Sequence, residues 1–230
     1  MNIVIVGASK GLGRAFASGL GGPEDTVFGV ARTQPPAFAH QAGQLCWIEA
    51  DLSNPLIAVG QIAAALPPVV DVLIYNLGLW EAQAFSADYD FQEDDDLAIM
   101  TMVNSNVTAT ILLIKRLLPQ LLASQRPRII LTGSTSALRQ SGRPEVTFGA
   151  TKTALNGIAD ALREGYRHQR LAVTTLQLGY LNTEDDLSVP LAQAALAGGG
   201  ETIPLHDVVM MTNSLLQLSE ATFVRELCLP

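Results

Sequence analysis

The chain has little of what a disulfide-stabilised, membrane-spanning or nucleic-acid-binding protein needs. Only two of its 230 residues are cysteine, and these lie far apart without the spacing of a metal site. Lysine and arginine number 14 against 22 acidic residues, which gives a net charge of −8. An acidic chain repels phosphate backbones, so we expect no nucleic acid partner. No uninterrupted apolar run approaches the roughly 18 residues of a membrane helix, so we expect no membrane partner.

The composition that remains is that of a well-packed globular protein. Hydrophobic residues make up 48% of the chain and charged residues only 16%, which favours a large core over disorder. The length fits one domain over residues 1–230. Met1–Val6 has no charged leader and predicts a strand rather than a signal peptide. We expect Cys46 and Cys228 to be reduced, as in a cytoplasmic protein.

Short apolar runs alternate with longer helical patterns along the whole chain. Most of the apolar runs lack strict alternation of apolar and polar residues, which is typical of strands buried on both faces of a parallel sheet. The predicted strands are Ile3–Val6, Thr26–Ala31, Leu45–Glu49, Val70–Tyr75, Arg128–Thr132 and Ala172–Gln177. The predicted helices are Gly11–Gly21, Asn54–Leu66 with Asn54 as its cap, Leu97–Ser124 and Ala150–Tyr166. This order predicts an α/β fold: a Rossmann-like, doubly wound parallel sheet of about seven strands with helices on both faces.

A glycine-rich turn joins the first predicted strand to the first predicted helix. Its sequence is Gly7-Ala8-Ser9-Lys10-Gly11-Leu12-Gly13. Glycines let the backbone turn sharply and let a pyrophosphate come close, and the free N–H groups at the start of the helix then face the anion. In this position the turn predicts a dinucleotide site.

The spacing of these glycines resembles that of the short-chain dehydrogenase/reductase family, and further matches extend over nearly the whole chain. By this resemblance the helix residue Asn106 supports a proton-relay water, Ser134 holds the carbonyl oxygen of the substrate, and Lys152 is the lysine of the Tyr-x-x-x-Lys motif. For Ser134 the neighbours Thr135 and Ser136 stay as alternatives. The resemblance also places cofactor contacts at Asp51, Leu52, Asn76, Gly78, Lys152, Gly179 and Thr183.

The chain departs from the family at the tyrosine of that motif. Phe148 stands four residues before Lys152 and has no O–H to give or accept. In the family the tyrosine gives a proton to the forming alkoxide, and the lysine lowers the tyrosine's pKa. Loss of a general acid typically costs about 10²–10⁴ in rate. We therefore expect a carbonyl/alcohol oxidoreductase acting on a small organic substrate, attenuated at this position.

Several readings of Phe148 remain open at this point. It could be an engineered Tyr-to-Phe change, or another group could supply the proton: Lys152, a water held by Asn106, or Tyr180. The protein could instead be a catalytically silent nucleotide-binding sensor or scaffold. It could also be a non-redox member of the family.

The second predicted strand ends in Arg32 rather than in an acidic residue. A guanidinium suits a ribose 2′-phosphate, and Lys10 would add a second charge, so we expect NADP(H), with NAD(H) as the alternative.

Glu93-Asp94-Asp95-Asp96 precedes a helix and is expected to complement its dipole, so no metal is expected. The irregular segment 184–204 is a candidate substrate lid. The resemblance implies a homodimer or homotetramer formed through the helices 97–124 and 150–166.

Overall fold

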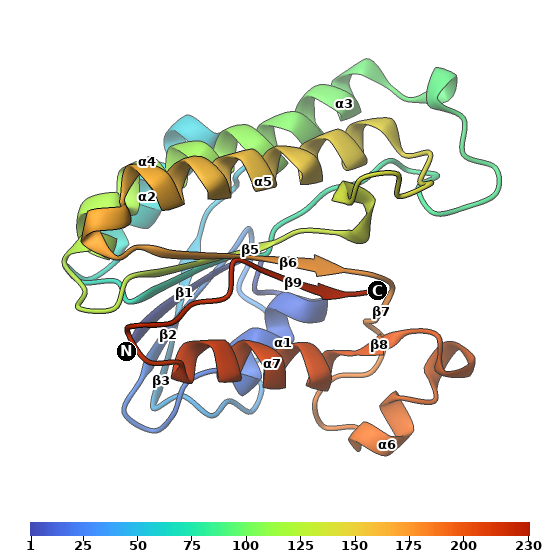
Figure 1. Ribbon diagram of the computed structural model, residues 1–230. Helices are drawn as coiled ribbons and strands as arrows, with labels where there is room; N and C mark the ends of the chain where they lie inside the picture. Colours follow the sequence, from blue (N-terminus) through green and yellow to red (C-terminus); the bar gives the residue numbers. More distant parts are fainter.

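A single seven-stranded sheet organises the computed structural model, which describes all of residues 1–230 (Figure 1). The strands are all parallel and follow the order β3-β2-β1-β4-β5-β6-β9. The chain order reverses between β1 and β4, and in open α/β sheets ligands bind beyond the carboxyl ends of the strands at such a point. The strands are β1 (Asn2–Val6), β2 (Thr26–Ala31), β3 (Gln44–Glu49), β4 (Val72–Tyr75), β5 (Arg128–Thr132), β6 (Ala172–Leu178) and β9 (Glu226–Leu229).

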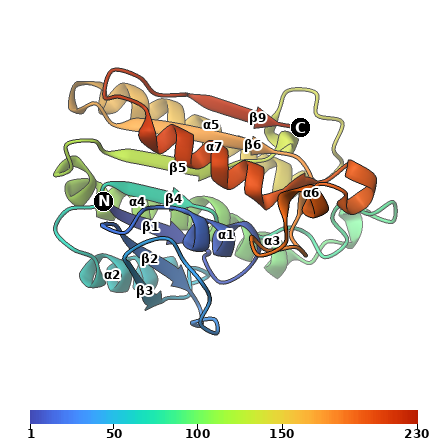
Figure 2. The ribbon, with the colours of Figure 1, turned by 90° about the horizontal axis from the view of Figure 1, so that it is seen from below.

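Helices cover both faces of the sheet, and each face has its own buried hydrophobic cluster (Figures 1 and 2). One face packs against α2 (Pro55–Ala65), α4 (Ala109–Leu122) and α5 (Val146–Gly165). The other packs against α1 (Gly11–Gly19) and α7 (Leu205–Gln217). The central strands are buried on both sides, which is why their sequences read as continuous apolar runs. The predicted fold class is therefore confirmed.

The structure differs from the sequence prediction in several places. No strand was predicted near the C-terminus, where β9 forms the last strand of the sheet. Helix α5 begins at Val146, four residues earlier than predicted, so Phe148 lies in its first turn. Asn54 is the N-cap residue of helix α2, as predicted, but its side chain makes no capping hydrogen bond. Pro55 at the first helical position supplies the fixed backbone angle instead.

The predicted helix Leu97–Ser124 is instead α3 (Asp96–Val103), a π-helical turn at Asn104–Thr108, and α4. The whole helical stretch Asp96–Leu122 is long and apolar enough to cross a membrane, which a count of uninterrupted apolar runs did not reveal. Here α4 packs against the sheet with one face inside the core, while α3 lies beside α5 (Figure 1). Asp95 caps α3 by accepting a hydrogen bond from the N–H of Ala98 at 2.8 Å, as expected for the acidic run.

The segment 184–204 contains two short helical pieces, α6 (Leu191–Ala194) and a 3-10 turn at Ala197–Gly200. A small parallel pair of strands brackets it, β7 (Leu181–Asn182) and β8 (Ile203–Pro204). The segment extends beyond the carboxyl end of the sheet, next to α7 (Figures 1 and 2).

Both cysteines are free thiols. Cys46 is on β3 and Cys228 on β9, which are the two edge strands of the sheet.

Candidate active site

The glycine turn leads from β1 into α1 and forms a close-packed cradle. Gly7 has a φ of +81°, a conformation that side-chain-bearing residues rarely adopt. A Cβ on Gly13 would lie 1.9 Å from the carbonyl oxygen of Gly7 and 2.9 Å from Nδ2 of Asn76. Helix α1 begins after Lys10 with no side-chain cap, so its first N–H groups have no side-chain partner. An uncapped helix start behind a glycine turn fits the pyrophosphate of a dinucleotide.

Replacing Gly13 by alanine is expected to lower the free energy of unfolding by about 1–3 kcal/mol, as overpacking does, and to weaken nucleotide binding. The added methyl would force the turn away from β1. Urea unfolding and nucleotide titration measure the two effects. Gly60→Ala in α2 is the matched control, since a Cβ there meets no atom within 4 Å; it should leave nucleotide binding unchanged. Equal behaviour of the two variants would contradict the close contact in the turn.

The residues expected near the adenosine half of the cofactor lie around this turn. Lys10 and Arg32 are exposed and make no ion pair, so both charges are free to meet an anion. Asp51 is exposed and accepts a hydrogen bond from the N–H of Ser53 at 3.1 Å, while the neighbouring Leu52 is a core residue. Thr183 lies against the turn: its Cγ2 would be 3.6 Å from a Cβ on Gly11.

A line of polar contacts connects the glycine turn to Lys152. Asn76, beside Gly13, accepts a hydrogen bond from the hydroxyl of Thr132 at 3.1 Å. The carbonyl of Thr132 accepts a hydrogen bond from Nζ of Lys152 at 2.8 Å. A Cβ on Gly78 would lie 3.0 Å from that Nζ, so the loop after β4 comes very close to the ammonium. The carboxyl ends of β1, β4 and β5 thus meet around one lysine.

Lys152 is almost completely buried, at 4% exposure, and has no carboxylate partner. Burial penalises its charged form and lowers its pKa from 10.5 to about 8. The Nζ atom lies 5.6 Å from the centre of the Phe148 ring, a cation–π contact. A lysine with this pKa can both hold and release a proton near neutral pH.

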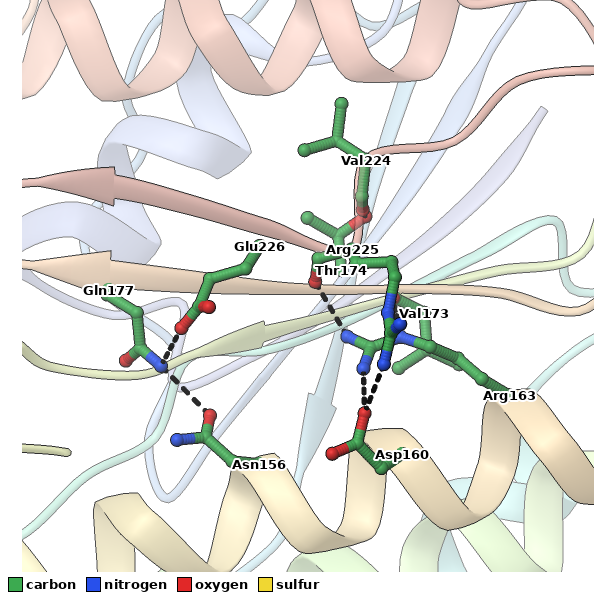
Figure 3. A network of polar contacts seen from close by, with 9 residues as sticks. All are labelled: Asn156, Asp160, Arg163, Val173, Thr174, Gln177, Val224, Arg225 and Glu226. Carbon is green, nitrogen blue, oxygen red and sulfur yellow. Dashed lines mark hydrogen bonds and ion pairs between the residues drawn. The ribbon is translucent and has the colours of Figure 1, made fainter. Parts of the chain in front are cut away.

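Ser134 follows β5 and is held in place from behind by Gln177 of β6. The N–H of Ser134 donates to Oε1 of Gln177 at 3.1 Å, and its hydroxyl oxygen accepts from the N–H of Ser136 at 3.1 Å. Gln177 is fully buried, and its Nε2 donates to Asn156 at 2.9 Å and to Glu226 at 2.7 Å (Figure 3). This network ties the serine turn to α5 and to the edge strand β9.

Asn106 occupies the middle of the π-helical turn and fastens the loop that follows β4. Its side-chain amide accepts from the N–H of Leu79 and donates to the carbonyl of Leu79, both at 2.8 Å, and donates to the hydroxyl of Thr151 at 3.0 Å. Two hydroxyls bind the carbonyls of the turn: Tyr75 donates to Ser105 at 2.6 Å, and Thr110 donates to Asn106 itself at 2.8 Å. The side-chain amide of Asn106 therefore holds the loop after β4 against α5.

Phe148 belongs to an aromatic cluster, which we define as Trp80, Phe85, Phe148 and Tyr180. The Phe85 ring packs edge-on against Phe148, with ring centres 5.4 Å apart, and against Tyr180 at 6.0 Å. Phe85 has a φ of +67°, which is strained for a bulky residue. Arg143 stacks on the Tyr180 ring at 4.5 Å and donates to its hydroxyl. The ring of Phe148 is therefore covered by apolar surface rather than by water.

Two buried glutamates hold the strained loop against the first turn of α5. Glu81 accepts from the N–H groups of Thr147 and Phe148, at 3.0 and 2.9 Å, at the positive end of the helix dipole. Glu145 accepts from the N–H of Phe85 at 2.8 Å. Each glutamate keeps its other carboxylate oxygen, Oε2, buried without a hydrogen-bond partner. These carboxylates fix both Phe85 and Phe148 in position.

The structure brings together the residues that the sequence singled out for the reaction. Asn106, Ser134, Phe148 and Lys152 all lie at the carboxyl end of the sheet. Gly179 follows β6 there, where a Cβ would lie 2.7 Å from the carbonyl carbon of Pro230. The supporting residues Thr132, Gln177, Glu81 and Glu145 were not predicted. Of these four residues only Gln177 left a signal in the sequence, because it is a glutamine inside a predicted buried strand.

The sequence of this chain is similar to those of known proteins. The profile of the family described as short chain dehydrogenase matches residues 1–191. An uncharacterized short-chain type dehydrogenase/reductase of Sinorhizobium fredii is 30% identical over 205 residues, covering 89% of this chain and 77% of that protein. An NADPH-dependent pterin aldehyde reductase of Arabidopsis thaliana is 26% identical over 197 residues, covering 79% and 75%.

Solved structures agree on the fold. A metagenomic short-chain oxidoreductase in complex with NADP superposes with a TM-score of 0.75 at 19% identity, covering 100% of this chain and 96% of that one. A likeness at this identity shows the fold alone. Together with the match of the family profile, it leads to one conclusion: the chain belongs to the short-chain dehydrogenase family, and is an oxidoreductase of that type.

Proposed function

We propose that this protein interconverts a carbonyl and an alcohol on a small organic substrate with NADP(H). Phe148 attenuates the rate, because it has no hydroxyl at the usual proton-donor position. The observation that carries the proposal is the buried Lys152, whose ammonium donates to the carbonyl of Thr132, two residues before Ser134. The bound nucleotide would supply or accept the hydride. Ser134 would hold the carbonyl oxygen by its hydroxyl, and the ring of Phe148 would keep water from the reacting atoms.

Lys152 is our candidate for the missing proton donor. During reduction its ammonium would pass one N–H proton to the forming alkoxide and become a neutral amine, which takes a proton back from water. Its lowered pKa, about 8, supports this role because the ammonium is present at neutral pH and releases its proton readily. Tyr180 is a weaker candidate, since its hydroxyl is already bound to Arg143.

The choice of NADP(H) over NAD(H) rests on the free charges of Arg32 and Lys10. A named relative that uses NADPH and a structural neighbour that holds NADP support the same choice. Replacing Arg32 by alanine is expected to weaken NADPH binding about tenfold or more, since a charge-assisted bond to phosphate is lost. NADH binding should change little. Fluorescence titration of both nucleotides measures this, with Arg116→Ala on the exposed face of α4 as control. Equal losses for NADPH and NADH would contradict it.

The second candidate function is a catalytically silent NADP(H)-binding sensor or scaffold. The observation that favours it is the covering of Phe148 by Phe85 and Tyr180, which leaves no acid at the usual position. Consumption of NADPH over a panel of ketones, aldehydes and quinones separates the two. Turnover that disappears in Ser134→Ala supports the enzyme, while tight NADPH binding without turnover supports the sensor. Product formation without net cofactor oxidation would indicate a non-redox member.

We further propose that the protein is cytoplasmic, and that segment 184–204 covers the substrate. A homodimer or homotetramer would form through α3, α4 and α5. Large apolar side chains support this assembly: Leu97 is 71% exposed, Met100 61% and Val146 48%. Such exposure on neighbouring helices is typical of an interface.

A further inference from the structure

A second feature lies at the opposite end of the sheet from the candidate active site. It is a hollow of about 970 Å³ at the amino ends of β5, β6 and β9. Three segments form its walls: the approach to β5 at 125–128, the end of α5 with the turn into β6 at 160–172, and the link from α7 to β9 at 219–225. The ends of α5 and α7, which border it, are on the left in Figure 1. A volume of this size suits a nucleotide-sized ligand.

The charge of this hollow is opposite to that of the chain. Three carboxylates line it, Asp160, Glu164 and Glu220. Six arginines line it as well: Arg126, Arg128, Arg163, Arg167, Arg170 and Arg225. The whole chain has 14 basic and 22 acidic residues and a net charge of −8. A local excess of positive charge in such a chain calls for a physical reason.

Three of the arginines pair with carboxylates. Arg163 and Arg225 both bind Asp160, at 2.7 and 2.9 Å, and so tie α5 to the edge strand (Figure 3). Arg163 also donates to the carbonyl of Val173 at 2.8 Å. The pair of Arg170 with Glu220, at 3.7 Å, is exposed and therefore weak.

The other three arginines have no carboxylate. Arg126 and Arg128 both donate to one carbonyl oxygen, that of Leu218, and Arg128 also donates to Leu215 at 3.0 Å. Two guanidinium groups therefore meet at the end of α7, and Arg128 as a whole residue is only 9% exposed. Burial and the charge of Arg126 lower the pKa of Arg128. The side chain of Arg167 makes no hydrogen bond or ion pair and borders the same hollow.

Two like charges that share one acceptor repel each other, and Arg128 is largely shielded from water. The negative end of the α7 dipole offsets only part of this cost. A bound dianion would offset the rest, because a guanidinium forms two parallel, charge-assisted bonds with a phosphate. Phe223, which is 42% exposed in the same hollow, offers a flat apolar surface to the remainder of a ligand.

We propose that this hollow is a second ligand site, which binds a phosphate-bearing small molecule through Arg126, Arg128 and Arg167. It is separate from the glycine turn, which is at the other end of the sheet. Binding there does not depend on the proposed oxidoreductase activity.

The test uses the full chain with inorganic pyrophosphate as the probe, measured by titration calorimetry with saturating NADPH present to occupy the glycine turn. The test variant is the double change Arg126→Ala and Arg167→Ala, both at exposed side chains. Arg116→Ala on α4 is the control. We expect one pyrophosphate site, weakened about tenfold or more in the double variant and unchanged in the control. NADPH binding should be equal in all three proteins.

Absence of pyrophosphate binding, or binding that the double variant leaves unchanged, would overturn the proposal. Binding of a poly-glutamate peptide without binding of pyrophosphate would also overturn it, in favour of an acidic protein partner. The single variant Arg167→Ala guards against misfolding, because this side chain contacts no polar partner. A several-fold loss of pyrophosphate affinity in that variant, with an unchanged thermal unfolding curve, would support the site.

Discussion

Replacing Phe148 by tyrosine is expected to raise the rate of NADPH-dependent carbonyl reduction about a hundredfold or more. The new hydroxyl would extend the ring that the ammonium of Lys152 contacts, with Nζ 5.6 Å from the ring centre. The nearby positive charge would lower the tyrosine's pKa and prepare it to give up a proton. Stopped-flow or steady-state consumption of NADPH over a carbonyl panel measures the gain.

Phe223→Tyr makes the same chemical change at the other end of the sheet and should leave the rate unchanged. If Phe148→Tyr binds NADPH and gains nothing, the site has moved away from carbonyl reduction. The sensor or non-redox function would then take precedence.

Replacing Lys152 by methionine is expected to abolish most of the activity, a loss of about 10²–10⁴. The variant keeps the length of the side chain but has no proton to give. Lys152→Arg should lose activity too, because an arginine keeps its charge and does not release its proton. Rates are compared with Lys115→Met, an exposed lysine on α4.

The pH dependence separates the proposed acid role from a structural one. The ammonium form of Lys152 is the donor, so activity should be full below a pH of about 8 and fall as pH rises through this value. The free energy of unfolding should instead rise as pH rises through the same range. The folded pKa is about 8 against 10.5 unperturbed, so the unfolded chain binds more protons between these values. Relative to Lys152→Met, the wild-type free energy of unfolding should therefore rise across this window, by up to about 3 kcal/mol. A flat rate profile through pH 8 would contradict the acid role.

The sequence predicted the fold well because its strands are buried on both faces and leave a strong apolar signal. It missed β9 because Glu226–Leu229 is a short edge strand whose pattern is set only by its neighbour β6. It singled out Ser134 and Lys152 as candidates through motif spacing. It could not identify Thr132, which acts through a backbone carbonyl, a group that every residue has. Glu81 was missed as well, because its role depends on a fold that brings a loop to the start of α5.

The π-helical turn at Asn104–Thr108 has a consequence for how this chain can change over evolution. A π-turn is one extra residue inserted into an otherwise regular helix. Deleting a single codon there would restore a continuous α-helix, while α3 and α4 would keep the faces that they turn to the core. The fold could survive that deletion, yet the amide of Asn106 would no longer reach both backbone groups of Leu79. The deletion of one codon would therefore be enough to keep the fold and lose the contact that holds the active-site loop in place.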